Sequence, residues 1–172
     1  NDFLLIYDEV QTGIGITGKM WAHQHFCETN CNLECMSHCK SMEPDIISFG
    51  KKTQCCGIFA GKRLDEIDDH VFKESSRINS TFGGNLVDMV RFTIYLEIME
   101  SENLVDLVSE NGSYLLSSLA SLQNEESNVV SNVRGKGLFC AFDLPSSELR
   151  NKLIAKVEDC LLYTSPSPRD TG

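Results

Sequence analysis

Short apolar runs divided by polar and glycine-bearing stretches fill the first half of the chain, and longer helix-type repeats fill the second. Residues 3–7 are continuously apolar and end at two acids, Asp8 and Glu9. Such a run is typical of a strand buried on both faces of a parallel sheet. Further strands are predicted at residues 46–49, 57–60 and 137–144. Strands of this kind, mixed with helices, predict an α/β fold class.

Helical segments are indicated by apolar positions that recur every three or four residues. The predicted helices cover residues 65–72, 86–100, 104–122 and 147–157. Asn85 and Ser146 are of the residue types that cap helix N-termini, and each precedes one of these segments. Apolar residues recur all around segment 86–100, which predicts a helix buried on more than one side.

Composition narrows the class of protein. A chain of 172 residues can build one domain with a core. Its net charge of -10 argues against nucleic acid or an anionic membrane as partner. No apolar run approaches the length of a membrane span, and no leader precedes the first strand. We therefore expect an intracellular protein, cytoplasmic or mitochondrial, whose N-terminus lies inside a domain.

Eight cysteines raise the question of disulfides or metal. Reduced thiols in an intracellular protein are the simplest interpretation. The first four stand at every fourth position, which places them on one helix face. They are Cys27, Cys31, Cys35 and Cys39. Over about three turns they cannot all reach one tetrahedral zinc ion. No metal ligand is assigned, although zinc and disulfides remain alternatives to an inert segment.

The chemistry of the chain points to two strand ends. Asp8 follows the first predicted strand, and Lys51 follows the second. Ligands of open α/β sheets bind at this edge. A lysine and an acid suit a cofactor that is held through an amine and carries a ring nitrogen in need of a counter-ion. The alternative is structural, because many α/β proteins carry such residues as caps.

Longer motifs around these residues resemble the class III aminotransferases, which use pyridoxal 5'-phosphate. The motifs lie at residues 8–22 and 44–52. Within the family the chain looks most like L-lysine 6-aminotransferase, on residues 49–57, 77–91 and 134–142. 4-Aminobutyrate aminotransferase is a near relative. The resemblance covers about residues 3–157.

The resemblance implies a role for five residues. Lys51 would hold the cofactor covalently and carry the proton during catalysis, and Asp8 would pair with the pyridine nitrogen. Both would be catalytic. Val10 would pack against the ring, and Gln11 would hydrogen-bond the 3'-oxygen. Thr81 would contact the phosphate across the interface of a homodimer.

The resemblance also implies the domain organisation, that of a fragment of a fold-type I transferase with parts missing at both ends. Residues 1–83 would form the C-terminal half of the large cofactor-binding domain, with an inert or mis-spliced insertion at about 27–42. Residues 84–102 would be a connecting helix, and residues 103–160 the start of a small α+β domain. The Ser/Pro-rich residues 161–172 are expected to be a non-native or disordered tail.

The implied reaction transfers the terminal amino group of L-lysine to 2-oxoglutarate, giving glutamate and 2-aminoadipate 6-semialdehyde. The alternatives are an aminotransferase for 4-aminobutyrate or another ω-amino acid such as ornithine, and a truncated non-catalytic paralogue. The fragment alone is expected to be inactive.

Overall fold

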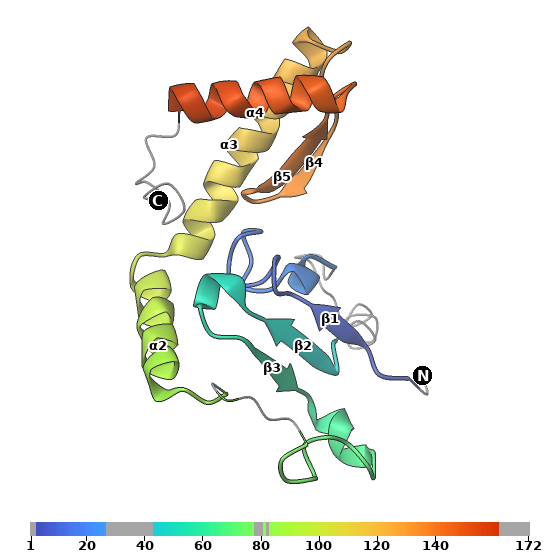
Figure 1. Cartoon of the computed structure of the whole chain (residues 1–172), viewed down its shortest axis with the longest axis vertical. Coiled ribbons are helices and arrows are strands. Elements are labelled where there is room, and N and C mark those ends of the chain that lie inside the picture. Colours follow the sequence, from blue (N-terminus) through green and yellow to red (C-terminus); the bar gives the residue numbers. More distant parts are fainter. Residues whose placement is uncertain (1–2, 27–42, 78–80, 82, 162–172) are drawn as a thin grey trace, which may run out of the picture. The chain divides into compact units, whose positions relative to one another are not determined.

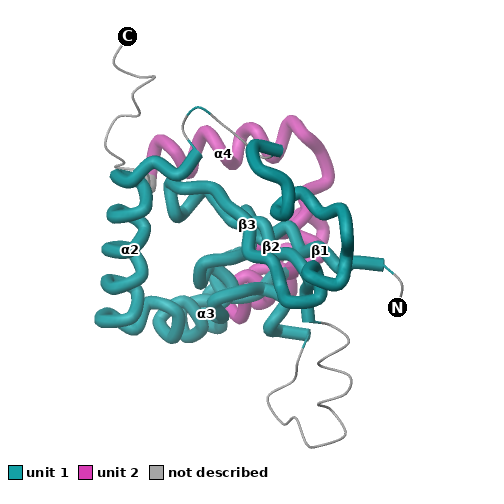
Figure 2. Tube along the Cα trace, turned by 90° about the horizontal axis from the view of Figure 1, so that it is seen from below, with its two compact units in different colours: residues 1–115, 135–139 teal, residues 116–134, 140–172 magenta. Residues whose placement is uncertain are grey.

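The computed structural model describes residues 3–26, 43–77, 81 and 83–161. The segment with four cysteines, residues 27–42, lies outside the described residues. So do residues 162–172 of the Ser/Pro-rich end. The chain divides into two compact units (Figure 2). Unit 1 contains residues 1–115 and 135–139, and unit 2 contains residues 116–134 and 140–172.

A three-stranded sheet is the centre of unit 1 (Figure 1). Its strands are β1 (Ile6–Asp8), β2 (Ile46–Phe49) and β3 (Gly57–Ala60), in that order. Strands β1 and β2 run parallel, with Asp8 opposite Ser48, whereas β2 and β3 are antiparallel. The parallel pairing was predicted and is confirmed. The prediction that the run at residues 3–7 is buried on both faces is wrong for the described chain, because Phe3 is 67% exposed and Ile6 59%.

Three short 3-10 helices connect the parts of unit 1. They are η1 (Ala22–Phe26), η2 (Lys51–Thr53) and η3 (Lys62–Glu66). The predicted helix 65–72 is wrong, since η3 ends at Glu66 and turns follow. Asp65, Asp68 and Asp69 would place like charges three and four residues apart on one helix face, which disfavours a helix there.

Helix α2 (Leu86–Ser101) begins as predicted at Asn85, whose side-chain oxygen accepts a hydrogen bond from the N–H of Val87 at 3.0 Å. Phe92 stacks on Phe49 of β2 with ring centres 5.6 Å apart. The expected burial on several sides is wrong, because no residue of α2 is buried. Leu86, for example, is 78% exposed. Nothing in the described part of the chain covers the remaining sides of α2.

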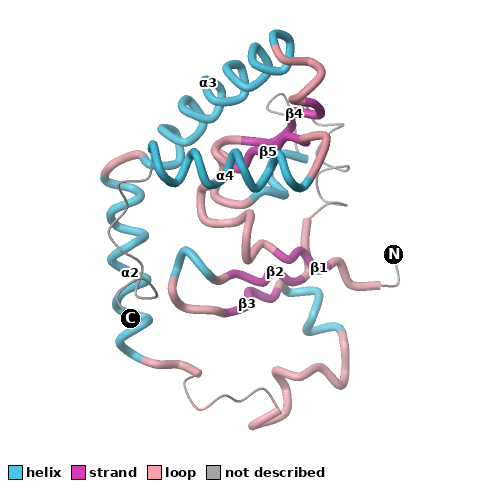
Figure 3. The backbone as a smooth tube through the Cα atoms, turned by 45° about the horizontal axis from the view of Figure 1, so that its top comes forward, coloured by secondary structure: helices cyan, strands magenta, loops and turns pink. Residues whose placement is uncertain are grey.

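The chain after α2 contains a two-stranded sheet and two helices (Figure 3), and unit 2 contains most of that sheet. Helix α3 (Leu104–Glu125) contains the division between the units, and β4 (Ser131–Lys136), β5 (Phe139–Asp143) and α4 (Ser147–Leu161) follow. Strand β4 was missed because Val133 is its only large apolar residue. The cap of α4 was found correctly, since the hydroxyl of Ser146 accepts a hydrogen bond from the N–H of Leu149 at 3.2 Å.

The turn between β4 and β5 makes a close backbone contact inside unit 1. The N–H of Leu138 donates to the carbonyl of Ile16 at 3.0 Å. Gly137 has a left-handed φ of 55°, and a Cβ added there would lie 2.6 Å from that same carbonyl oxygen. Gly112 of α3 is buried against Gly137. Side chains at either glycine would force the three segments apart.

Candidate active site

The carboxyl ends of β1 and β2 bring Asp8 and Lys51 to one edge of the sheet. The Ser48 hydroxyl, opposite Asp8 in the parallel register, donates to Asp8 Oδ1 at 2.9 Å. The N–H of Val10 donates to the same oxygen at 3.1 Å. Both bonds use Oδ1, and no described residue donates to Oδ2. The carboxylate is therefore oriented through one of its two oxygens.

These contacts keep Asp8 ionised. The N–H of Val10 and then the Ser48 hydroxyl hold the pKa of Asp8 below its ordinary value, against a smaller opposing effect of desolvation. The positive charge of Lys51 adds to the lowering of that pKa. A hydrogen-bonded carboxylate of this kind can face a protonated ring nitrogen without taking up its proton.

Lys51 has a backbone conformation that is unusual for a lysine. Its φ of 54° lies in the left-handed region, where residues with a Cβ are uncommon. Such strain costs on the order of 1 kcal/mol or more and concentrates at functional positions. The side chain of Lys51 is exposed at the strand end.

Lys52, the next residue, differs from Lys51 in its burial and in its hydrogen bond. It is half-buried, and its Nζ donates to the carbonyl oxygen of Gln11 at 2.5 Å. Desolvation, and then the charge of Lys51, lower the pKa of Lys52, with Glu9 opposing them. Lys52 is thus bound to the loop after β1, and Lys51 is the lysine exposed at the edge.

The loop after β1 is organised by Glu9, only 3% of which is exposed. Its Oε2 accepts from the Thr12 hydroxyl at 2.6 Å and the Ala22 N–H at 3.0 Å. Its Oε1 accepts from the His23 N–H at 2.8 Å and lies 3.1 Å from His23 Nδ1. Burial by itself would raise the pKa of Glu9, but the bonds from Thr12, His23 and Ala22 hold it below its ordinary value.

The side chains of the other three predicted site residues, Val10, Gln11 and Thr81, make no hydrogen bond to Asp8 or Lys51 in the described chain. Val10 is half-buried beside Gly50, since a Cβ on that glycine would lie 3.7 Å from Val10 Cγ1. Gln11 has an exposed side chain in the same loop. Thr81 is exposed in a turn before α2, and no contact within the described chain joins it to Asp8 or Lys51.

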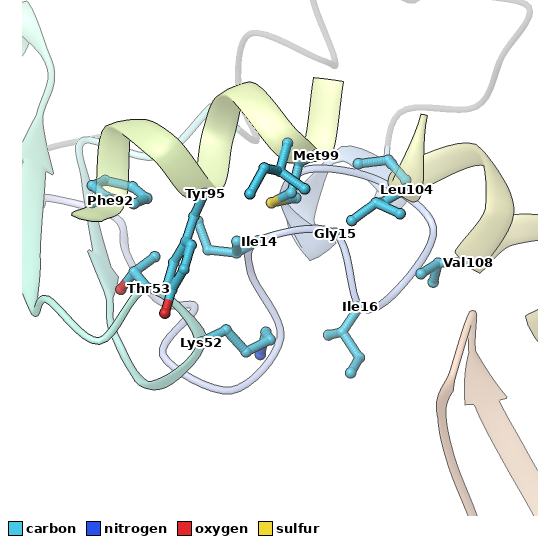
Figure 4. A pocket seen from close by; sticks show the side chains of 12 residues that line it. Ile14, Gly15, Ile16, Lys52, Thr53, Phe92, Tyr95, Met99, Leu104 and Val108 are labelled. Carbon is cyan, nitrogen blue, oxygen red and sulfur yellow. The ribbon is translucent and has the colours of Figure 1, made fainter. Parts of the chain in front are cut away.

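A cavity of about 370 Å³ lies beside the loop that follows Gln11 (Figure 4). Phe92, Tyr95 and Met99 line it from α2, and Ile14 and Lys52 line it from the loop and η2. Its walls are mainly apolar, and neither Asp8 nor Lys51 belongs to them. The cavity is thus separate from the pair of charged residues at the sheet edge.

Two cysteines, Cys55 and Cys56, follow Lys51 closely in the chain, and both are free thiols. Cys55 is buried, and this burial, followed by the charge of Asp88, raises the pKa of its thiol. A Cβ on Gly50 would lie 2.9 Å from the sulfur of Cys56. In the part of the chain that the structure describes, no group of three or more acidic, His or Cys side chains is arranged to hold a metal ion. No helix within that part is long and apolar enough to cross a membrane.

Two site residues, Ser48 and Glu9, were missed by sequence reasoning. The signal for Ser48 was available: it is the third residue of its strand, as Asp8 is of β1, so a parallel register sets them side by side. The signal for Glu9 was weak, because its partners Thr12, Ala22 and His23 come together only through the folding of the loop.

Comparison with known proteins gives the family context of this geometry. The family described as Aminotransferase class-III matches residues 1–167. The L-lysine-epsilon aminotransferase of Mycobacterium tuberculosis is 44% identical over 170 residues, covering 99% of this chain and 35% of the relative. The mitochondrial 4-aminobutyrate aminotransferase of Rattus norvegicus is 36% identical over 152 residues, covering 87% and 26%. The chain thus spans about a third of the length of the curated relatives it matches.

A solved structure agrees with the sequence comparison. The lysine aminotransferase from M. tuberculosis superimposes with a TM-score of 0.78 at 46% sequence identity. The superposition covers 92% of this chain and 33% of the other. The mixed α/β arrangement described above is therefore that of a segment of such enzymes.

Proposed function

Because this chain belongs to the class-III aminotransferase family, we propose that it contributes the catalytic lysine and the ring-nitrogen acid of a pyridoxal-phosphate-dependent aminotransferase. The observation that carries the proposal is the placement of two side chains. An oriented, ionised Asp8 ends strand β1, and an exposed Lys51 follows the adjacent parallel strand β2. The family uses pyridoxal phosphate, and the residues at this edge are suited to it.

The fit to the cofactor rests on the donor set. When bound, pyridoxal phosphate supplies an aldehyde that reacts with amines and a pyridine ring that accepts electron density from the neighbouring carbon. Asp8 would hold the proton on the ring nitrogen, while Ser48 and Val10 orient its carboxylate through Oδ1. A low pKa of Asp8 favours this, because the carboxylate stays anionic beside the N–H.

Lys51 would hold the cofactor and then act as the proton carrier. A lysine side chain offers a primary amine, which suits a group that first binds covalently and afterwards moves a proton. Lys52 is the weaker candidate, because its Nζ already donates to the carbonyl oxygen of Gln11.

The other residues would complete the cofactor site. Val10 would pack against the ring, and the exposed amide of Gln11 would hydrogen-bond the 3'-oxygen. Thr81 would reach the phosphate from the other subunit of a homodimer. Its exposed position, without a contact to Asp8 or Lys51 in this chain, is compatible with that role.

The domain organisation follows the same proposal. Residues 1–83 would belong to the large domain, residues 84–102 would connect the domains, and residues 103–160 would begin the small domain. The exposed apolar side chains of α2 support a connecting role, because they offer a surface for parts of the enzyme beyond this chain.

We propose L-lysine as the amino donor and 2-oxoglutarate as the acceptor, with glutamate and 2-aminoadipate 6-semialdehyde as products. The support is the higher identity to lysine-epsilon aminotransferases, 44% against 36% for the rat 4-aminobutyrate enzyme. 4-Aminobutyrate and ornithine are the alternative donors. A truncated non-catalytic paralogue is the alternative outside enzymes.

The test is an absorbance spectrum of the complete protein, expressed with pyridoxal phosphate, beside the variants Lys51→Ala and Lys62→Ala. Lys62 is a matched control, since it is an exposed lysine in η3. We expect a near-visible cofactor band that shifts on addition of L-lysine, is lost in Lys51→Ala and survives in Lys62→Ala. A wild-type protein without such a band would refute the proposal. A band that shifts with 4-aminobutyrate or ornithine but not with L-lysine would refute L-lysine as the donor.

A further inference from the structure

The buried carboxylate of Glu9 is surrounded by hydrogen-bond donors. It lies in the chain between Asp8 and Val10, is almost fully buried, and faces four donor groups of Thr12, Ala22 and His23. Because an ionised carboxylate only accepts hydrogen bonds, His23 presents its Nδ1 as a donor. The His23 ring is held in turn by stacking on Tyr7, with ring centres 5.3 Å apart.

The backbone N–H and carbonyl of Glu9 are hydrogen-bonded as well. Its N–H donates to the carbonyl of Ser48 at 3.0 Å, and its carbonyl accepts from the N–H of Gly13 at 2.8 Å. The neighbouring N–H of Val10 is the group that orients Asp8 Oδ1. A rotation of the peptide at Glu9 would therefore move the hydrogen bond that fixes Asp8.

The same loop has a second support. Lys52 donates to the carbonyl of Gln11, two residues after Glu9. Glu9 thus holds the loop through residues 12, 22 and 23, and Lys52 holds it at residue 11. Gln11, whose side chain is exposed, is thus held at its own carbonyl and precedes Thr12, which Glu9 holds.

We propose that Glu9 is a positioning residue for the cofactor site, whose buried carboxylate sets the orientation of Asp8 and Gln11. This inference rests on the proposed function of Asp8 and Gln11. Glu9 touches neither the cofactor nor the substrate in this role. It acts through the peptide of Val10 and through the shape of the loop from Thr12 to His23.

Chemistry explains why a carboxylate is needed at this position. The four groups around it are all donors, and only a group with two acceptor oxygens can satisfy them together. Glutamine is nearly isosteric, but its NH₂ would face donors and leave part of the cluster unpaired. Thr12→Val removes a single donor, keeps the volume, and leaves the carboxylate in place.

The experiment compares cofactor affinity and folding in the complete protein. Apo wild type, Glu9→Gln, Thr12→Val and the control Glu66→Gln are titrated with pyridoxal phosphate at a temperature well below their unfolding midpoints. Glu66 is an exposed glutamate at the end of η3. The absorbance maximum of each bound form is recorded as a signature of the charge around the ring.

We expect Glu9→Gln to weaken cofactor binding about tenfold or more, since hydrogen bonds to charged groups contribute at that level, and to shift the absorbance maximum. Thr12→Val should weaken binding in the same direction by a smaller factor, and Glu66→Gln should bind as wild type does. If Glu9→Gln does not fold, Thr12→Val decides. Wild-type affinity and an unshifted band in the folded variants would overturn the inference. A wild type that binds no cofactor would instead refute the proposed function.

Discussion

Replacing Gly137 by alanine is expected to destabilise unit 1 through two separable effects. The first is the backbone: a φ of 55° costs a residue with a Cβ about 1 kcal/mol. The second is space, because the new Cβ would lie 2.6 Å from the Ile16 carbonyl oxygen and 2.8 Å from the Gly18 nitrogen. These neighbours are backbone atoms and cannot rotate away, so relief needs the segments to separate, at about 1–3 kcal/mol.

The expected loss is therefore about 2–4 kcal/mol in the free energy of unfolding, the sum of these two effects. Gly84→Ala is the matched control, because Gly84 has a φ of 72° but no heavy atom of the described chain within 4 Å of the added Cβ. It should show the backbone cost alone, about 1 kcal/mol.

The assay is urea unfolding of the complete protein, followed by circular dichroism. With a slope of about 1–3 kcal/mol per molar urea, Gly137→Ala should lower the midpoint on the order of 1 M relative to wild type. The Gly84 variant should lower it clearly less. Equal midpoints for the two variants would refute the reasoning, because the contact between the β4–β5 turn and residues 16–18 would then contribute nothing.

Two further predictions concern buried polar groups. Thr17 is 3% exposed and its Oγ1 has no hydrogen-bond partner among the described residues, so Thr17→Val should leave the urea midpoint unchanged or raise it, within roughly 1 kcal/mol. A large loss would show that the hydroxyl has a partner. Because the folded-state pKa of Glu9 lies below its ordinary 4.5, its contribution to stability is present above that value and is lost as the pH falls through the lowered pKa. Unfolding midpoints measured from pH 7 to pH 3 should therefore fall less steeply in Glu9→Gln than in wild type, and parallel curves would contradict the prediction.

The sheet and the helix starts could be predicted because local residues determine them. The runs at residues 46–49 and 57–60 became β2 and β3, and Asn85 and Ser146 cap the helices that follow them. Strand β4 could not be found, because a strand with Val133 as its only large apolar residue lacks the usual alternation.

Burial was predicted less well than secondary structure. The apolar pattern of residues 86–100 indicates which faces of α2 favour burial. It does not indicate which residues cover those faces. Leu86 at 78% exposed and Val87 at 64% show this directly. The chain spans about a third of the length of its curated relatives.

The candidate site was predicted in part. The strand ends that hold Asp8 and Lys51 follow from two apolar runs and a parallel register, and the structure sets these residues close enough to interact electrostatically. The roles assigned to Lys51, Asp8, Val10, Gln11 and Thr81 all stay predictions. The hydrogen bonds of Glu9 join residues of an irregular loop whose sequence has no repeating apolar pattern. They are visible only in the folded structure.

The central claim is that Lys51, and not the adjacent Lys52, holds the cofactor. The most direct test is to reduce the complete protein with borohydride in the presence of pyridoxal phosphate, digest it, and locate the added cofactor mass by tandem mass spectrometry. The account predicts the modification on Lys51, because Lys52 Nζ is bound to the Gln11 carbonyl. Modification of Lys52, or of neither lysine, would contradict it.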